Sequence, residues 1–188
     1  MGDYQAVVVH PCNDPFVIAS QGMVIGKLVD QFDHLDIVLG LVGGGGLLSG
    51  LGLAAQALRP RMAIFACEPA GALDAMDSVK QNRIVSMPNP NTLADGLRTS
   101  LGELTLPMLR RHVAGFFAVE GEEIVQAMQF AYERLTLVIE PSSVVALVPR
   151  LRQEPQLVGK RVGVVRTGGN VAWLRPWPRL DSAETLQQ

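Results

Sequence analysis

The sequence predicts an α/β fold of three layers, αβα, built on a mostly parallel sheet. Short β-branched runs alternate with longer segments in which apolar residues recur at helical spacing, the order typical of strand–helix–strand units. The run 36–42 is apolar on both faces, as expected of a parallel strand covered by helices above and below. With 188 residues, 48% hydrophobic and 18% charged, the chain is long enough for a core and too apolar for overall disorder.

The first elements follow from apolar spacing and from helix-start residues. An apolar run at 6–9 is closed by His10-Pro11, and proline cannot continue a central strand. Asp14-Pro15 predicts a helix start, because aspartate caps a helix and proline suits its first position; the apolar spacing extends this helix over 16–32. The next expected elements are a strand at 36–42, a helix at 47–58, a strand at 62–66 and a helix within 70–82.

The second half continues the alternation after a loop. Residues 83–102 are rich in Pro, Asn, Gly and Ser, which favours irregular structure. The elements expected after it are a helix at 104–113, a strand at 115–119, a helix at 122–137, a helix beginning at Glu140-Pro141 and a last strand at 161–165. Acidic residues at 120, 122 and 123 complement the dipole at the start of the long helix. Ligands in such sheets bind outside the carboxyl ends of the strands.

Composition excludes several classes of protein. Lys plus Arg is 16, Asp plus Glu is 18, and the net charge is -2, which is no footprint for nucleic acid. The apolar stretches fall short of the roughly 20 residues that span a bilayer, and no signal peptide is visible. Two cysteines fit a reducing compartment better than a disulfide scaffold. We expect a cytoplasmic globular protein with no nucleic-acid or membrane partner.

Four consecutive glycines, Gly43 to Gly46, join a buried strand to a helix. A glycine costs up to about 1 kcal/mol relative to alanine in a regular element, so packing is a weak explanation for four in a row. Glycine leaves backbone N–H groups accessible, and these groups together with the positive end of a helix bind phosphate. The spacing fits neither a dinucleotide fingerprint nor a P-loop. The sequence favours a phosphate cradle; a flexible turn is the alternative.

Five motifs lie in order along the chain: Val42-Gly43-Gly44-Gly45-Gly46-Leu47, Glu68-Pro69, Leu93-Ala94-Asp95-Gly96, Ile139-Glu140-Pro141-Ser142 and Thr167-Gly168-Gly169-Asn170. In this order the chain resembles the fold-type-II pyridoxal-phosphate enzymes, specifically the threonine/serine dehydratase and serine racemase branch. The resemblance covers residues 4–172. It implies a tryptophan-synthase-β-like cofactor domain over 1–175, incomplete at its N-terminus, followed by a polar tail at 176–188.

The resemblance implies that these motifs bind pyridoxal 5'-phosphate. The family's glycine loop holds the cofactor phosphate, which maps onto Gly43 to Gly46 and Leu47. The family's Ser-Gly-Gly-Asn loop places a hydroxyl on the pyridine nitrogen, and Thr167 keeps a hydroxyl there, although an ordinary turn is the alternative. A neutral hydroxyl cannot protonate the ring as aspartate would, so the ring is a poorer electron sink and β-elimination is favoured. Gly96 and Glu140 are expected to line the ring's surroundings.

A divalent-cation site known in part of this family matches Glu68, Ala72 and Asp74. Two carboxylates and the Ala72 carbonyl supply hard oxygen ligands suited to Mg²⁺ or Ca²⁺, and water would complete the shell. Exposed, solvated carboxylates are the alternative. Cys12 stands where the family often has phenylalanine; we interpret it as a small buried hydrophobe without a role.

The family's cofactor-binding lysine has no counterpart in this sequence. The three lysines are Lys27, Lys80 and Lys160, and none lies in the Ser-x-Lys-x-Arg-like segment that the family uses. The family's small domain and substrate-carboxylate loop are also missing. We therefore assign no catalytic residue within this chain and expect no turnover from it alone. A fragment of a longer enzyme and a truncated relative are both open.

The resemblance implies an ammonia-lyase that eliminates the hydroxyl of serine or threonine to give a 2-oxo acid and ammonia. Serine racemase is one alternative. A non-catalytic module that binds pyridoxal phosphate or phosphate is another, and so is a module that pairs with a full-length homologue. The implied partners are a small amino-acid substrate and a second copy in a homodimer. Preference between serine and threonine stays open.

Overall fold

The computed structural model describes residues 7–171. Its sheet has four strands in the order β3-β2-β1-β4, and every neighbouring pair is parallel. The strands are β1 (Ile37–Leu41), β2 (Ala63–Pro69), β3 (Val113–Val119) and β4 (Val162–Val164). Because all four run the same way, their carboxyl ends meet at one edge of the sheet, where ligands of such folds bind.

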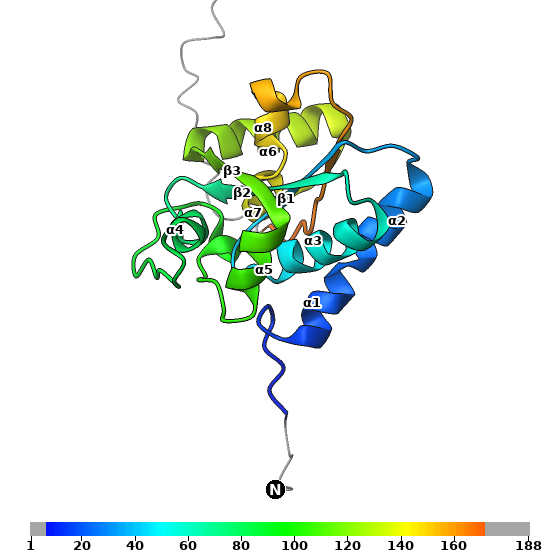
Figure 1. Cartoon of the computed structure of the whole chain (residues 1–188). Coiled ribbons are helices and arrows are strands. Elements are labelled where there is room, and N and C mark those ends of the chain that lie inside the picture. The colour runs from blue at the N-terminus through cyan, green and yellow to red at the C-terminus, as the bar shows by residue number, and fades with distance from the viewer. Residues whose placement is uncertain (1–6, 172–188) are drawn as a thin grey trace, which may run out of the picture.

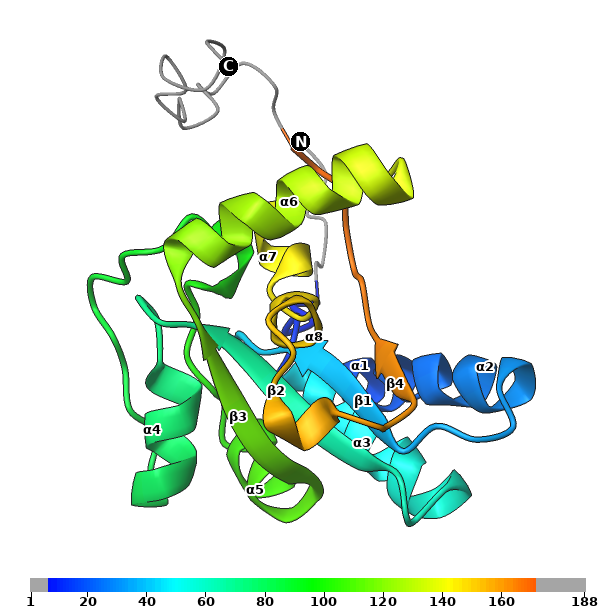
Figure 2. The ribbon, with the colours of Figure 1, turned by 90° about the horizontal axis from the view of Figure 1, so that it is seen from above.

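Helices cover both faces of the sheet, which confirms the three-layer αβα prediction (Figures 1 and 2). One face carries α1 (Pro15–Gln21), α2 (Met23–Gln31), α3 (Gly46–Leu58), α4 (Asp74–Gln81) and α5 (Thr105–His112). The other face carries α6 (Gly121–Leu135), α7 (Pro141–Val144) and α8 (Val148–Leu151). Two single turns of 3-10 helix, η1 (Asp95–Leu97) and η2 (Pro155–Leu157), lie in the connections.

The position of β1 inside the sheet, between two apolar clusters, explains why this strand has no polar side. Ile37 and Leu39 pack into the apolar cluster beneath α6 and α7, whereas Val38 packs into the cluster beneath α3 and α5. All five residues of β1 are buried. Alternate side chains of a strand point to opposite faces, so a strand covered twice must be apolar throughout.

The prediction of one helix over 16–32 is wrong, because the structure has two helices that meet where the chain approaches α3 closely. The chain turns at Gly22, between α1 and α2. A Cβ on Gly22 would lie only 3.2 Å from the Gly50 carbonyl oxygen and from the Ala54 Cβ of α3. The apolar spacing continues across this junction, so periodicity alone could not reveal the break.

Other boundaries also differ from the prediction; for example, the strand expected at 62–66 extends to Pro69. The helix expected within 70–82 is confined to α4, because a turn in which the Ala72 N–H bonds the Pro69 carbonyl at 2.8 Å precedes it. The apolar run at 6–9 forms no strand over its described part, and the three valines at 7, 8 and 9 are exposed. The tail at 176–188 lies outside the described residues.

Local signals for helix starts are confirmed. Asp14 caps α1, and its carboxylate accepts the N–H groups of Phe16 and Val17 at 2.8 and 3.1 Å. Glu120 and Glu123 form a capping box at the start of α6. Within residues 7–171, no helix has both the length and the apolarity needed to cross a membrane.

Candidate functional site

The glycine loop, Gly43 to Gly46, leaves β1 and opens α3 at the edge where the strands end. Gly45 takes the left-handed conformation, with φ of 85°, and no side chain caps the helix. The first N–H groups of a helix have no partner within it, and the positive end of the helix dipole lies there. The loop thus presents uncapped donors at the start of a 13-residue helix.

The loop's carbonyl groups are held by buried hydroxyls. The Thr105 hydroxyl donates to the Gly44 carbonyl at 2.8 Å, and the Ser49 hydroxyl donates to the Gly45 carbonyl at 2.7 Å. Both side chains are fully buried. These two bonds fix the orientation of the peptide units, so the loop is ordered rather than a flexible turn. No sequence motif marked Thr105 or Ser49.

Packing also demands glycine here, which corrects the expectation that packing explains the tetrad poorly. A Cβ on Gly43 would lie 2.9 Å from the Thr99 Oγ1, and a Cβ on Gly46 would lie 2.8 Å from the Cys12 Cα. The Cys12 sulfur occupies the space that a Cβ on Gly44 would need. The packed loop leaves Gly43, Gly44 and Leu47 partly exposed, whereas Gly45 and Gly46 are buried.

Cys12 has a structural place that the sequence did not reveal. It is half-buried, and the segment around it is held over the glycine loop. The His10 Nδ1 accepts the N–H groups of Cys12 and Asn13 at 3.2 and 2.9 Å, and the Asn13 Oδ1 accepts the Leu104 N–H at 2.9 Å. Burial raises the pKa of the Cys12 thiol, so the side chain is a neutral packing group.

Thr167 and its neighbours form the second part of the site, at the end of β4. The Thr167 side chain is exposed, and its Oγ1 lies 2.9 Å from the Oγ of buried Ser143. The Ser143 Oγ also accepts the N–H groups of Thr167 and Gly168 at 2.6 and 2.8 Å. Ser143 lies on α7, one residue beyond the motif Ile139-Glu140-Pro141-Ser142. The loop after β4 is therefore fixed by α7.

Glu140 and Gly96 join the same cluster from two other segments. Glu140 is the N-cap residue of α7; its N–H donates to the Gly168 carbonyl at 3.2 Å, and its Oε2 accepts the Asn170 N–H at 3.2 Å. The Gly96 N–H donates to the Ser142 Oγ at 2.9 Å. Gly96 also reaches the glycine loop, because a Cβ on Gly43 would lie 3.4 Å from its carbonyl oxygen. Four segments that the sequence marked separately thus meet at one edge of the sheet.

The two carboxylates of the predicted cation site are buried, so the alternative of solvated side chains is wrong. Glu68 is 1% exposed and Asp74 is 3% exposed. The Glu68 carboxylate accepts the N–H groups of Ala75 and Met76 at 2.7 and 3.0 Å. The Asp74 Oδ2 is buried and has no hydrogen-bond partner. A buried carboxylate oxygen without a partner is costly unless a ligand satisfies it.

Burial dominates the electrostatics of this pair. It raises the pKa of Glu68 to about 8, against the lowering effect of the Ala75 and Met76 amides. It also raises the pKa of Asp74 to about 6, against hydrogen bonds from the backbone of Asp74 and from Ser100. Ala72 is buried in the turn before α4. Among residues 7–171, no group of three or more His, Cys, Asp or Glu side chains is placed to hold a metal, so carbonyl or water ligands would have to complete a shell.

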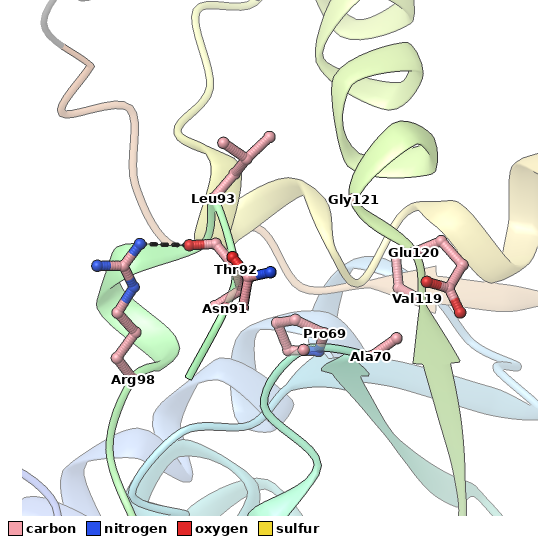
Figure 3. Close-up of a pocket in the computed structure, with 10 residues that line it drawn as sticks. Pro69, Ala70, Asn91, Thr92, Leu93, Arg98, Val119, Glu120 and Gly121 are labelled. Carbon is pink, nitrogen blue, oxygen red and sulfur yellow. Dashed lines mark hydrogen bonds between the residues drawn. The ribbon is translucent and has the colours of Figure 1, made fainter. Parts of the chain in front are cut away.

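A separate pocket of about 660 Å³ lies at the carboxyl ends of β2 and β3 (Figure 3). Its only cation and carboxylate side chains already have partners: Arg98 donates to the Thr92 carbonyl, and Glu120 belongs to the capping box of α6. None of the predicted site residues lines this pocket. The residues that do are Pro69, Ala70, Gly71, Asn91, Thr92, Leu93, Arg98, Val119, Glu120 and Gly121.

The residues at this edge of the sheet lie within a segment that matches a known protein family. The family model described as "Pyridoxal-phosphate dependent enzyme" matches residues 2–168. The chain belongs to the pyridoxal-phosphate-dependent enzyme family. The match contains both the glycine loop and Thr167, so the resemblance inferred from the five motifs is confirmed.

The chain is similar in sequence to curated members of the pyridoxal-phosphate-dependent family. The chain is 44% identical over 163 residues to beta-hydroxyaspartate dehydratase of Paracoccus denitrificans and 39% identical over 184 residues to serine racemase of Arabidopsis thaliana. These alignments cover 87% and 95% of the chain, and 52% and 56% of the relatives.

Solved structures of the same fold type match equally well. The maize serine racemase structure aligns with a TM-score of 0.86 and 38% identity, over 89% of this chain and 54% of that one. The T.th. threonine deaminase structure aligns with a TM-score of 0.83 and 37% identity, over 88% of this chain and 62% of that one. The expected fold type II is confirmed, and the chain spans about half the length of the curated relatives it matches.

None of the three lysines of this pyridoxal-phosphate-family chain, all within the described residues, lies on the glycine loop or at the carboxyl end of a strand. Lys27 is exposed on α2, and Lys80 is exposed in the last turn of α4, whereas the N-terminal end of α4 follows the carboxyl end of β2. Lys160 is exposed just before β4, at the amino edge of the sheet. Within residues 7–171, no lysine at the end of a strand is therefore available to a cofactor at the carboxyl edge of the sheet.

Proposed function

We propose that the chain is the cofactor-binding part of a pyridoxal-phosphate-dependent ammonia-lyase that acts on small 3-hydroxy amino acids such as serine or threonine. The reaction removes the β-hydroxyl and gives a 2-oxo acid and ammonia. The observation that carries the proposal is the ordered glycine loop: Thr105 and Ser49 hold its carbonyls, and the start of α3 has no side-chain cap. The names of the dehydratase and deaminase relatives support this reaction class.

The residues present fit pyridoxal phosphate. The N–H groups of Gly43 to Leu47 and the dipole of α3 would bind the phosphate, and the Thr167 hydroxyl would hydrogen-bond the pyridine nitrogen. When bound, the cofactor supplies an electron-withdrawing ring that makes the substrate's α-proton more acidic. Thr167 is neutral and would not hold a proton on the ring nitrogen as an aspartate carboxylate would. This favours early departure of the β-hydroxyl, and Gly96 and Glu140 would line the ring.

A divalent cation belongs to the proposal as a structural ligand beside the cofactor site. Buried Glu68 and Asp74, with the unpartnered Asp74 Oδ2, offer the hard oxygen atoms that Mg²⁺ or Ca²⁺ prefers. The Ala72 carbonyl would be a third ligand. Ser100 connects this place to the glycine loop, because it interacts with Asp74 and its carbonyl oxygen would lie 3.7 Å from a Cβ on Gly44.

Assembly and location are part of the same proposal. We expect a homodimer in the cytoplasm, in keeping with two free cysteines and with exposed apolar side chains at Val7, Val8 and Phe16 that a partner surface would cover. Light scattering of the purified protein measures the assembly. A mass of one chain over the micromolar range would contradict the dimer.

Serine racemase is the second candidate, and the sequence and structure of serine racemases resemble this chain closely. The two reactions differ in what happens to the β-hydroxyl: racemisation retains it and elimination removes it. With the complete protein and L-serine, chiral chromatography detects D-serine and a coupled assay detects pyruvate. Pyruvate as the main product supports the lyase, and D-serine as the main product supports the racemase.

Cofactor binding by the chain itself is the direct test. Titration followed by absorbance should show that pyridoxal phosphate binds more tightly than pyridoxal, which lacks the phosphate, and that inorganic phosphate competes. Borohydride should leave the bound cofactor removable on denaturation, because the family's lysine is missing. Equal affinity for pyridoxal and pyridoxal phosphate would contradict the phosphate cradle.

A further inference from the structure

The Ser143 hydroxyl uses its full hydrogen-bonding capacity, two lone pairs and one hydrogen, within the protein. Its Oγ lies 2.6 Å from the Thr167 nitrogen, 2.8 Å from the Gly168 nitrogen and 2.9 Å from the Thr167 Oγ1. The residue is 1% exposed, so water does not compete for these partners. All three contacts converge on the loop that leaves β4.

The lone pairs and the hydrogen of the Ser143 hydroxyl determine which of the two hydroxyls is the donor. A serine hydroxyl has two lone pairs and one hydrogen. The two backbone N–H groups are obligatory donors and use both lone pairs of the Ser143 oxygen. The remaining contact, to the Thr167 Oγ1, must therefore use the Ser143 hydrogen, and Thr167 is the acceptor.

This leaves the Thr167 hydrogen free to point out of the protein. The Thr167 side chain is exposed, and its oxygen already accepts the bond from Ser143. Hydrogen bonds in a chain polarise one another, so an oxygen that accepts one bond donates more strongly through its own hydrogen. These hydrogen bonds all donate in one direction: the two amides donate to Ser143, Ser143 donates to Thr167, and Thr167 donates outward.

We infer that Ser143 is a positioning residue that makes the Thr167 hydroxyl an outward hydrogen-bond donor, selective for an unprotonated aromatic ring nitrogen. The inference rests on the proposed function, because the ring nitrogen is that of pyridoxal phosphate. Ser143 itself does not touch the ligand in this assignment. It acts by fixing both the place and the direction of the Thr167 hydroxyl.

Ser142 provides a matched control for Ser143. It is the adjacent residue of the same helix, it is also buried, and its Oγ accepts a backbone N–H at 2.9 Å, that of Gly96. This bond is made to the segment around Gly96 and not to the loop after β4. Ser142→Ala therefore removes a similar hydroxyl from the same short helix but leaves the bonds of Thr167 in place.

The first measurement uses the chain without ligand. Amide hydrogen exchange by NMR should be about tenfold faster at Thr167 and Gly168 in Ser143→Ala than in the parent, since each amide loses its acceptor. Ser142→Ala should leave both rates unchanged. If exchange at these two amides is the same in Ser143→Ala and the parent, Ser143 does not hold the loop and the inference is overturned.

The second measurement compares pyridoxal phosphate with its 1-deaza analogue, in which carbon replaces the ring nitrogen. The parent should prefer pyridoxal phosphate by about tenfold, the size of one hydrogen bond. Thr167→Val and Ser143→Ala should both abolish the preference, while Ser142→Ala retains it. A preference that survives in Ser143→Ala overturns the inference, because a merely structural role would weaken both ligands alike.

The same titrations distinguish this inference from the proposed function. If the parent binds both analogues equally but still prefers pyridoxal phosphate to pyridoxal, the phosphate cradle stands and the assignment of Thr167 and Ser143 falls. If the parent shows no preference for the phosphate, the proposed cofactor site falls and the ring-nitrogen assignment falls with it.

Discussion

The Cys12 sulfur fills the space that a Cβ on Gly44 would occupy. This relationship joins the segment before α1 to the loop that opens α3. The same cysteine contacts Gly46, whose Cβ would lie 2.9 Å from the Cys12 carbonyl oxygen. The geometry of the glycine loop therefore depends on a residue that lies outside the loop and to which the sequence assigned no role.

Gly44→Ala should destabilise the protein through this contact. Overpacking of a filled site costs about 1–3 kcal/mol, and Cys12→Ala in the same chain should restore part of the loss because it removes the sulfur. Urea unfolding of the parent, both single variants and the double variant gives the coupling energy of the pair. Additive effects of the two substitutions would show that the sulfur is not the obstacle.

Buried Glu68 predicts a stability that falls as pH rises. Its pKa is about 8 in the folded protein and near 4.5 in an unfolded chain, so between these values the folded state holds a proton that the unfolded state lacks. The free energy of unfolding then decreases with rising pH across this window. Asp74, with a pKa of about 6, adds to the decrease at the acidic end.

Unfolding midpoints measured in EDTA from about pH 5 to about pH 8 test this pH dependence, because the range lies between the unfolded and folded pKa values of Glu68. Glu68→Gln should flatten the decline, because glutamine carries no titrating proton. Glu122→Gln is the control, since that carboxylate is exposed at the start of α6. A parent whose stability rises over the same range would rule out a neutral buried Glu68.

Divalent cations should raise thermal stability if Asp74 holds one. An ion at a hundredfold excess over its Kd stabilises the folded state by about 2.7 kcal/mol, or about 5–10 °C in Tm for a chain of this size. Differential scanning fluorimetry with Mg²⁺ or Ca²⁺ measures the shift. Asp74→Asn should remove it, whereas Asp77→Asn, one turn along α4 and less buried, should keep it. The same shift in both variants would show that Asp74 does not bind the ion.

Loss of the α1 cap should weaken the whole segment over the glycine loop. Asp14→Ala leaves the N–H groups of Phe16 and Val17 without their acceptor and should cost about 1 kcal/mol. Asp30→Ala, an exposed position on α2, should cost much less. Chemical denaturation of the two variants compares them directly, and equal losses would argue against the cap.

Local chemistry made much of the fold predictable. The fully apolar run around β1 predicted a strand covered on both faces, and Asp14-Pro15 and the glutamates at 120 and 123 predicted helix starts that the structure contains. These signals depend on neighbours in the chain. The break at Gly22, where α3 approaches from elsewhere in the fold, was missed because the apolar spacing continues across it.

The sequence by itself determined the identity of the motif residues: the glycine loop, Thr167, Glu140 and the two carboxylates Glu68 and Asp74. Only the tertiary structure decided how they are held. Ser143 became a partner of Thr167 across 24 residues, and Thr105 became a partner of Gly44 across 61. A hydroxyl has no periodicity and serves equally in solvent or in a core, so its role is decided by what the fold places beside it. Burial, which separates a solvated carboxylate from a buried one, is likewise a property of the packed chain.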